Sequence, residues 1–371
     1  MILSSVQLKN FRSHRNTEIN FSGNINYITG GNGQGKTTLL ESIYYLCTTK
    51  SNIAKADSDV VCFNEENFEI KGSFNNSINN EVRIYYSAEE NKKYYFKNDK
   101  QVFRAAEVIG QFPVVLLTPA DHAITQGSPS DRRKFIDSVI SQASETYLKN
   151  LLDYNKTLKQ RSQLLSRLKE QKQFFYTTEL EAWTEKLVAA GSEIIKARKR
   201  FCKEFNRFIA ESYNVIMESD EIPGVAYNYL DGSGTDEIEK LFSDMLSQKK
   251  DEELRRASNL IGPHRDDFIF SINDLNLKTF GSQGQHKTFQ VVLRFAEFFY
   301  LKEMTNRVPI FLLDDVFGEL DINRSSKISS YLSKVGQAFI TLTDFTNLSY
   351  LQKEEDDLIL YVSKGNVSYG T

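Results

Sequence analysis

The stretch that decides the fold is Gly30-Gly31-Asn32-Gly33-Gln34-Gly35-Lys36-Thr37. It matches the full phosphate-binding loop pattern, in which two glycines separated by four residues are followed by lysine and a hydroxyl residue. An apolar run at residues 25–29 precedes the loop, and residues 36–48 carry leucine and isoleucine at helical spacing. Strand, loop and helix therefore come in the order that this pattern requires. We expect a nucleotide phosphate site here rather than a simple glycine turn.

The residue types of this loop each have a chemical task. Glycines let backbone N–H groups turn toward phosphate oxygens at the N-terminus of the following helix. Lys36 is expected to reach the β- and γ-phosphates, as a catalytic residue, and the Thr37 hydroxyl is expected to bind Mg²⁺. The candidate nucleotide-binding residues of the loop are Gly30, Gly31, Asn32, Gly33, Gln34, Gly35, Lys36, Thr37 and Thr38.

A P-loop needs a second carboxylate on the metal side, at the exit of a buried strand. Ile310-Phe311-Leu312-Leu313-Asp314-Asp315 supplies it, since four consecutive apolar residues predict a strand buried on both faces. We expect Asp314 to hold Mg²⁺ and Asp315 to orient or deprotonate the attacking water, both as catalytic residues. The alternative is an acidic turn after a strand.

A second candidate phosphate site opens the helix predicted from residue 283. Ser282-Gln283-Gly284-Gln285 places a hydroxyl, two amides and a glycine at this helix N-terminus, which favours an anion. Because the chain has one P-loop, we expect these residues to contact the γ-phosphate of a nucleotide held by a partner subunit. The alternative is that Ser282 only caps the helix.

The order of predicted elements indicates an α/β fold interrupted by helices. Strands are expected at residues 2–8, 17–21 and 25–29, a β meander at 67–104, and two long helices between about 130 and 213 joined near residues 172–178. Strands and helices alternate again after residue 267. We therefore predict one ATPase head assembled from residues 1–129 and 216–371, with the helical arm at 130–215 inserted between them.

Taken together, these motifs resemble the RecF family, a bacterial branch of the SMC-type ABC ATPases. The resemblance runs in the same order from Met1 to about residue 344. It rests on residues 10–14, 33–41, 127–137, 160–165 with Trp183, 262–267, 282–285, 312–316 and 319–321. Thr38, His286 and Lys287 depart from the usual residues, and the switch position near residues 341–344 has no histidine.

The resemblance implies a P-loop ABC-type head that binds ATP with Mg²⁺, dimerises when ATP is bound, and places Arg12 at the nucleotide. It also implies a cytoplasmic DNA repair and recombination protein with a slow, DNA-stimulated ATPase used as a switch. Such a protein would bind double-stranded and gapped DNA and act with RecR and RecO to help load RecA. For residues 262–267, either a bracing charge pair or a link to dimer contacts is possible.

The distribution of charge along the chain, rather than the net charge, favours nucleic-acid binding. The chain carries a net −3, yet residues 131–210 hold 17 basic and ten acidic side chains, so the arm carries +7 and the rest −10. Such basic stripes suit phosphate contacts, although a solvated helix face is the usual alternative. The candidate DNA-binding residues are Arg132, Arg133, Lys196, Arg198, Lys199 and Arg200.

Other classes fit poorly. Three widely spaced cysteines (Cys47, Cys62 and Cys202) favour neither a zinc site nor a disulfide framework, and no apolar run approaches the length of a membrane span. A transporter ATPase subunit would carry Leu-Ser-Gly-Gly-Gln, which is absent. An SMC-type tether would need a far longer helical insertion than about 80 residues.

Overall fold

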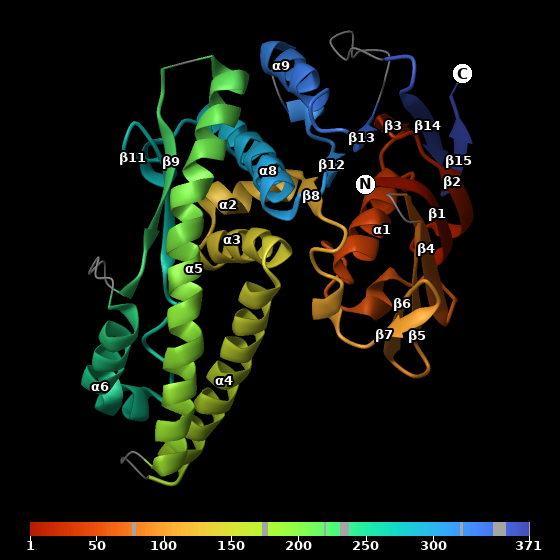
Figure 1. Ribbon diagram of the computed structural model, residues 1–371. Helices are drawn as coiled ribbons and strands as arrows, with labels where there is room; N and C mark the ends of the chain where they lie inside the picture. Colours follow the sequence, from red (N-terminus) through yellow and green to blue (C-terminus); the bar gives the residue numbers. More distant parts are fainter. Residues whose placement is uncertain are drawn as a thin grey trace. The chain divides into compact units, whose positions relative to one another are not determined.

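The computed structural model (Figure 1) describes residues 1–75, 79–172, 177–218, 220–230, 237–319, 322–343 and 354–370. The chain divides into two compact units. We call Met1–Asp121, Glu211–Asp220 and Lys287–Thr371 the head unit. The helical unit comprises His122–Ala210 and Glu221–His286. None of the described helices combines the length and apolar character that crossing a membrane requires.

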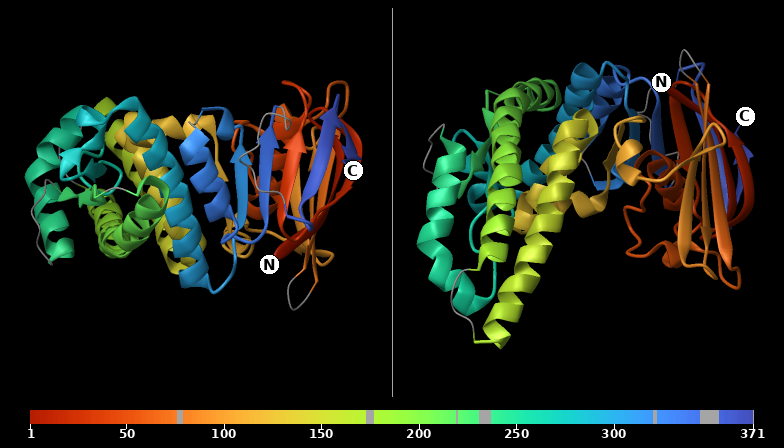
Figure 2. Two further views of the ribbon diagram at one scale, coloured as in Figure 1. Left: turned by 90° about the horizontal axis from the view of Figure 1, so that it is seen from above. Right: turned by 60° about the horizontal axis from the view of Figure 1, so that its bottom comes forward.

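An antiparallel sheet forms one layer of the head unit. Its strands are β1 (Ile2–Phe11), β2 (His14–Asn20), β4 (Asn67–Asn75), β5 (Asn80–Ser87), β6 (Lys92–Lys97) and β7 (Lys100–Val102). They pair in the order β2-β1-β4-β5-β6-β7, and Figure 2 (right) shows them side by side in red and orange. Burial alternates residue by residue along β4, so one face packs on the core and the other faces water.

A mostly parallel sheet forms the second layer of the head unit and combines strands from both ends of the chain. They are β3 (Ile25–Thr29), β8 (Val114–Leu117), β12 (Ile310–Asp314), β13 (Ala338–Leu342), β14 (Leu358–Ser363) and β15 (Asn366–Tyr369). The order is β15-β14-β3-β13-β12-β8, with β15 antiparallel to β14. Every residue of β3, β12 and β13 is buried, as expected for parallel strands covered on both faces.

Helix α1 (Lys36–Thr48) contacts strands of both sheets, and its leucines join one core cluster with residues of each layer. The remaining helical elements of the head are η1 (Asp57–Val60), η2 (Ala105–Glu107), η3 (Pro119–Asp121), α8 (Gln283–Thr305), η5 (Phe317–Glu319) and α9 (Ile322–Leu332). The first four residues of α8 belong to the helical unit.

The helical unit is built around two long helices. Its elements are α2 (His122–Gln126), α3 (Pro129–Ala143), α4 (Glu145–Glu170), α5 (Thr178–Met217), α6 (Ile238–Arg256), α7 (Leu277–Phe280), β9 (Pro223–Asn228), β10 (Asp267–Ile272) and β11 (Leu275–Asn276). The last seven residues of α5 belong to the head unit. Leu164, Leu165 and Leu168 of α4 pack against Leu180 and Trp183 of α5, so the predicted helical hairpin is present. The three strands pair in the order β11-β10-β9.

Local sequence signals explain where several of these helices begin. Ser128 and Asp131 form a reciprocal capping box at α3, and Pro129 occupies its first turn, where a missing N–H costs nothing. The Ser144 side chain caps α4 by accepting a hydrogen bond from the Tyr147 N–H. The predicted strand at 25–29 and the helices starting at 36 and 283 begin at the expected residues.

The grouping of the chain differs from the predicted boundaries in three segments: 122–129 belongs to the helical unit, 211–215 belongs to the head, and the largest difference is at 221–286. Residues 221–286 belong to the helical unit, whereas the sequence placed 216–371 in the head. The reason is long-range packing: β10 packs on α3 and α6 packs on α4, so this segment completes the helical unit. The predicted junction between the long helices lies largely outside the described residues.

Candidate nucleotide site

The P-loop leaves the carboxyl end of β3 and is held in shape by backbone conformations that favour glycine. Gly30 has φ +151°, and a Cβ there would lie 2.3 Å from the Val362 carbonyl oxygen. Gly35 has φ +109°, and a Cβ there would lie 2.9 Å from both His14 Nε2 and Ser13 Oγ. The close approach of neighbouring strands therefore requires glycine at both positions.

Lys36 folds back over the loop that precedes it. Its Nζ donates hydrogen bonds to the carbonyl oxygens of Gly30 (2.6 Å) and Gly31 (2.9 Å). Burial lowers the pKa of this ammonium group, and the nearby carboxylates of Asp315 and Asp314 oppose that shift. Lys36 bonds here to neutral carbonyls, so phosphate oxygens can replace these partners with a stronger, charge-assisted bond.

The acidic residues lie at the carboxyl end of β12, two strands away from β3 with β13 between them. Asp314 Oδ1 accepts hydrogen bonds from the Thr37 hydroxyl (3.0 Å) and from the Thr341 hydroxyl of β13 (2.7 Å). Burial raises the pKa of Asp314. Asp315 is exposed and has φ +49°, in the left-handed region.

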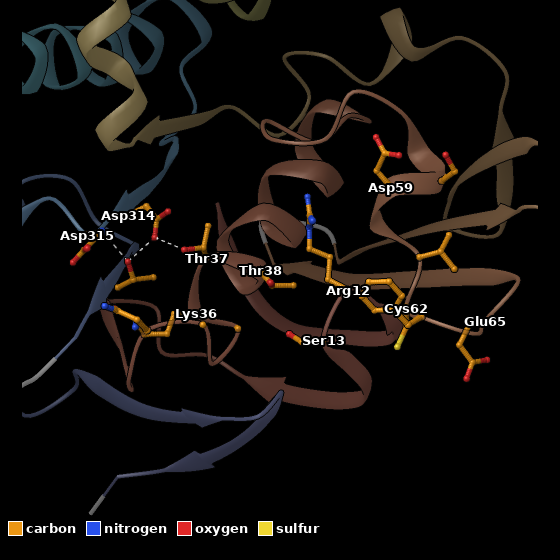
Figure 3. A pocket seen from close by; sticks show the side chains of 17 residues that line it. Arg12, Ser13, Lys36, Thr37, Thr38, Asp59, Cys62, Glu65, Asp314 and Asp315 are labelled. Carbon is orange, nitrogen blue, oxygen red and sulfur yellow. Dashed lines mark hydrogen bonds between the residues drawn. The ribbon is translucent and has the colours of Figure 1, made fainter.

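These residues line one cavity of about 750 Å³. Figure 3 shows Lys36, Thr37, Asp314 and Asp315 at one end, with Cys62 and Glu65 at the other and Arg12 between. The predicted residues that line it are Arg12, Asn32, Gly33, Gly35, Lys36, Thr37, Thr38, Asp314 and Asp315. Gly30 and Gly31 contribute the carbonyls that hold Lys36.

The predicted Arg12 is engaged by a buried carboxylate. Its guanidinium makes a two-pronged ion pair with Glu41 of α1, with Nη2 2.8 Å from Oε1. The Glu41 side chain is fully buried, while Arg12 keeps 28% of its side chain exposed to the cavity. Glu41 therefore fixes the position of Arg12 at the wall of the cavity.

Sequence reasoning missed two contributions to the site. The turn between β14 and β15 holds the predicted Gln34, because Lys364 N–H donates to Gln34 Oε1 (2.7 Å) and Gly365 N–H donates to Gln34 O (3.1 Å). The segment from Ser58 to Glu65 lines the far end of the cavity. Neither segment contains a local sequence motif from which a contribution to the site could have been predicted.

The predicted residues 282–285 lie in the helical unit, at the start of α8. Ser282 N–H donates to Gln285 Oε1 (2.9 Å), and Ser282 Oγ accepts from Gln285 N–H (3.1 Å). This reciprocal cap satisfies two backbone groups of the helix start. Ser282 and Gln283 are nevertheless exposed at the surface, so the cap leaves them accessible.

The stretch 262–267 lies at the centre of a set of buried polar contacts in the helical unit, which we call the hub. The hub consists of Arg132, Asp137, Tyr154, Arg161, Arg198, Tyr227, Glu253, Asn259, His264, Asp266 and Asp267. Arg132 forms a two-pronged pair with Asp267 (2.7 and 2.8 Å). Arg198 pairs with Asp137 (3.0 and 2.9 Å) and donates to Pro263 O (2.7 Å).

The hub also contains an ion pair with no exposure to solvent. Arg161 Nη2 lies 2.6 Å from Glu253 Oε2, and both side chains are fully buried.

Burial also shifts the pKa values of two other hub residues: it raises the pKa of Asp266 to about 6 and lowers the pKa of His264 to about 4. The sequence leaves two roles open for residues 262–267, bracing the active-site strands through a charge pair or linking the nucleotide to dimer contacts. The contacts of the hub lie inside the helical unit and hold its own helices and strands together.

The hub separates the predicted DNA-binding residues into two groups. Arg132 and Arg198 are 5% and 2% exposed and are saturated by carboxylates, so neither is available to a phosphate in this structure. Arg133 and Lys199 are half-buried, whereas Lys196 and Arg200 reach solvent on one face of α5. Apolar neighbours of Arg198 at helical spacing, such as Phe201, Cys202 and Phe205, were the sequence signal for its burial.

A P-loop after a buried parallel strand, with paired carboxylates on a strand two places away, defines a P-loop ATPase head. A family model described as the RecF/RecN/SMC N terminal domain matches residues 2–357. Smc head structures share the fold, one from Pyrococcus furiosus with a TM-score of 0.57 at 16% identity over 100% of this chain and 96% of that one.

Nearer relatives narrow this class. The DNA replication and repair protein RecF of Chloroherpeton thalassium is 42% identical over 353 residues, 93% of this chain and 95% of the relative. RecF of Streptococcus gordonii is 35% identical over 99% of this chain and 100% of its own length. A structure of the recombination mediator protein RecF-ATPrS in the RecFOR pathway superposes with a TM-score of 0.90 at 30% identity, covering 100% and 98%. The chain belongs to the RecF family, and the predicted family and fold class are confirmed.

Proposed function

We propose that this chain is an ATP-dependent, DNA-binding recombination mediator of DNA replication and repair. Acting in the cytoplasm with RecR and RecO, it would help load RecA onto gapped DNA. The observation that carries the proposal is the Thr37 hydroxyl, 3.0 Å from Asp314 beside a complete P-loop, in a member of the RecF family. The related structures with ATP and ATPrS support the choice of nucleotide.

ATP with Mg²⁺ is the ligand that suits the cavity chemistry. Thr37 and Asp314 offer hard oxygen ligands, and Mg²⁺ commonly takes one or two protein oxygens together with substrate phosphates. Among the described residues no group of three or more metal-binding side chains gathers, which is compatible with that mode. Bound Mg²⁺ would neutralise phosphate charge. Lys36 would then bind the β- and γ-phosphates, and residues 58–65 would face the rest of the nucleotide.

Hydrolysis would be slow and serve as a switch. Asp315 lines the cavity with an exposed carboxylate and would accept the proton of the attacking water. The water oxygen bonds to the γ-phosphorus as the bond to the bridging oxygen of ADP breaks. Because the usual histidine is missing near residues 341–343, we expect low turnover.

ATP would close two subunits into a dimer. Each composite site would join the P-loop of one copy to Ser282, Gln283, Gly284 and Gln285 of the other, since the start of α8 is exposed and its N–H groups favour a phosphate. Light scattering with ATP tests this, using Asp315→Asn to slow hydrolysis. Ser282→Arg should prevent dimer formation while ATP still binds. The matched control is Ser138→Arg, at an exposed position of α3. A mass that stays monomeric in the Asp315→Asn variant contradicts the composite site.

DNA would contact a stripe on α5. Lys196, Arg200, Lys203 and Arg207 are spaced by four, three and four residues, which puts them on one helix face, opposite the buried Phe201 and Phe205. Lys196 keeps 42% of its side chain exposed, and the other three are exposed. Lys196 and Arg200 are among the predicted DNA-binding residues, and Lys203 and Arg207 extend the same helix face. The buried Arg132 and Arg198 are left out of the stripe.

The stripe is tested by the salt dependence of duplex DNA binding. Replacing Lys196, Arg200, Lys203 and Arg207 by alanine should reduce the slope of log K against log salt by up to about 3–4. The control replaces four exposed basic residues of α6: Lys240, Lys249, Arg255 and Arg256. Equal effects of the two sets would place DNA elsewhere or point to net charge alone.

The most informative measurement for the whole proposal is ATP hydrolysis with duplex, single-stranded or gapped DNA. We expect the largest stimulation with duplex DNA next to a gap. Stimulation by a membrane partner but not by DNA would instead support a transporter subunit.

A further inference from the structure

The Thr341 hydroxyl joins the two acidic residues of the site. Thr341 is the fourth residue of β13 and lies opposite Asp314 in the parallel register of β12 and β13. Its Oγ1 donates a hydrogen bond to Asp314 Oδ1 (2.7 Å) and accepts one from the Asp315 N–H (2.8 Å). Thr341 is 1% exposed and lies at the wall of the nucleotide cavity.

The bond to Asp314 fixes the carboxylate on the metal side. Asp314 Oδ1 receives the Thr341 hydroxyl from β13 and the Thr37 hydroxyl from α1, so donors from two different elements meet on one oxygen. Two donors at one oxygen restrict rotation of the carboxylate, since any rotation stretches one of the bonds. Losing the Thr341 donor leaves Asp314 held through Thr37, a residue that itself would bind Mg²⁺.

The bond from Asp315 fixes the neighbouring residue by its backbone. Asp315 has φ +49°, a conformation that residues with a Cβ seldom adopt and that persists only where surroundings enforce it. The Asp315 N–H is held by Thr341, and its carboxylate lines the cavity. The hydroxyl of Thr341 therefore helps determine where the Asp315 carboxylate points.

We infer that Thr341 is a positioning residue for ATP hydrolysis, which sets the Asp314 and Asp315 carboxylates in register with each other and with Thr37. This inference rests on the proposed function. It assigns a role to a residue at the switch position, where the chain has no histidine. The role is indirect, since both hydrogen bonds of the Thr341 hydroxyl go to the two acidic residues.

The test compares Thr341→Val, which keeps the branched shape and removes the hydroxyl, with Thr341→Ser, which keeps the hydroxyl. Thr305→Val is the matched control, because Thr305 Oγ1 also donates to a carbonyl (Leu301 O, 2.7 Å) and accepts from a backbone N–H (Arg307, 3.2 Å). The full-length chains are measured for kcat and KM of ATP with duplex DNA, for binding of a fluorescently labelled ATP, and for melting temperature.

We expect Thr341→Val to lower kcat by at least about tenfold, because small displacements of catalytic groups cost this much or more. KM and the dissociation constant of labelled ATP should stay within about threefold of wild type, while Thr341→Ser recovers most of kcat and Thr305→Val changes nothing. An unchanged kcat in Thr341→Val overturns the inference. So does a serine variant as slow as valine, or a loss of kcat matched by lost binding, since either indicates a packing role. A wild-type chain that neither binds nor hydrolyses ATP overturns the proposed function, and the inference with it.

Discussion

The nucleotide cavity of the head and the hub of the helical unit are both rich in charge, yet they satisfy it differently. In the cavity, Lys36 bonds to neutral carbonyl oxygens, and Asp315 is exposed at its wall. In the hub, arginines pair with carboxylates, and the Arg161–Glu253 pair is fully buried. Charges with replaceable partners are suited to a ligand, whereas charges that saturate each other inside a unit hold helices together.

The largest effect should come from breaking the hub. Arg161→Met leaves Glu253 charged and buried without its partner, so the free energy of unfolding should fall by about 3–5 kcal/mol. Urea unfolding followed by circular dichroism measures this. The control is Arg167→Met, because Arg167 and Glu179 form a pair whose side chains are each 55% exposed, and such pairs contribute at most about 1 kcal/mol. Equal losses in both variants would contradict the distinction between hub and surface.

A second prediction concerns pH. Because the pKa of Asp266 is raised, the native state binds a proton that the unfolded state lacks between pH 3.8 and about 6. The contribution of Asp266 to stability therefore falls as the pH rises through this range. The lowered pKa of His264 does the opposite, and its contribution rises between about 4 and 6.5. The two opposing contributions largely cancel in the wild-type chain.

Replacing Asp266 by asparagine should expose the contribution of His264. The unfolding free energy of Asp266→Asn should rise by up to about 3 kcal/mol from pH 4 to 6.5, whereas wild type should change less. Denaturant titrations across this range provide the measurement, and Asp244→Asn in α6 is an acidic control at an exposed position. Parallel pH profiles for wild type and Asp266→Asn would rule out the compensation.

In the cavity, a conservative change should affect chemistry and spare the fold. Lys36→Arg keeps the charge but cannot reproduce the contacts of the ammonium group, so kcat should fall about 100-fold while some ATP still binds. The melting temperature should stay near that of wild type. Lys50→Arg, at an exposed position after α1, is the control. Unchanged turnover would remove Lys36 from the site.

The smallest effect should come from the support of the P-loop. Gly365 has φ +78°, and a Cβ there would lie 2.2 Å from the Ser13 carbonyl oxygen. Gly365→Ala should therefore displace the turn that holds Gln34 and weaken ATP binding by about tenfold, in line with roughly 1–3 kcal/mol of backbone strain. Titration with labelled ATP measures it, with Gly224→Ala of the helical unit as control. Wild-type affinity would show that the turn does not support the loop.

Contiguous motifs allowed much of this molecule to be predicted. The signals for the strand at 25–29, the helix at 36–48 and the acidic pair at 314–315 each lie in consecutive residues. A local pattern was therefore enough to predict these elements and the position of the acidic pair. The roles of the predicted site residues remain predictions. The role of Thr341 and the support from the β14–β15 turn depend on partners 26 and 330 residues away, which no local pattern reveals. The burial of Arg198 had a local signal in its apolar neighbours, but its partner Pro263, 65 residues away, had none.

The same long-range turn has a consequence for how the protein is made. The side chain of Gln34 can receive the hydrogen bond seen in the folded head only after Lys364, 330 residues later, has been synthesised. At the usual pace of synthesis, about 5–20 residues per second, that interval lasts roughly 20–60 s. For most of this interval the two strands that flank β3 in the folded head, β13 and β14, have not yet been made. A nascent chain on the ribosome therefore lacks the turn that holds the P-loop at Gln34 until the β14–β15 hairpin has been made.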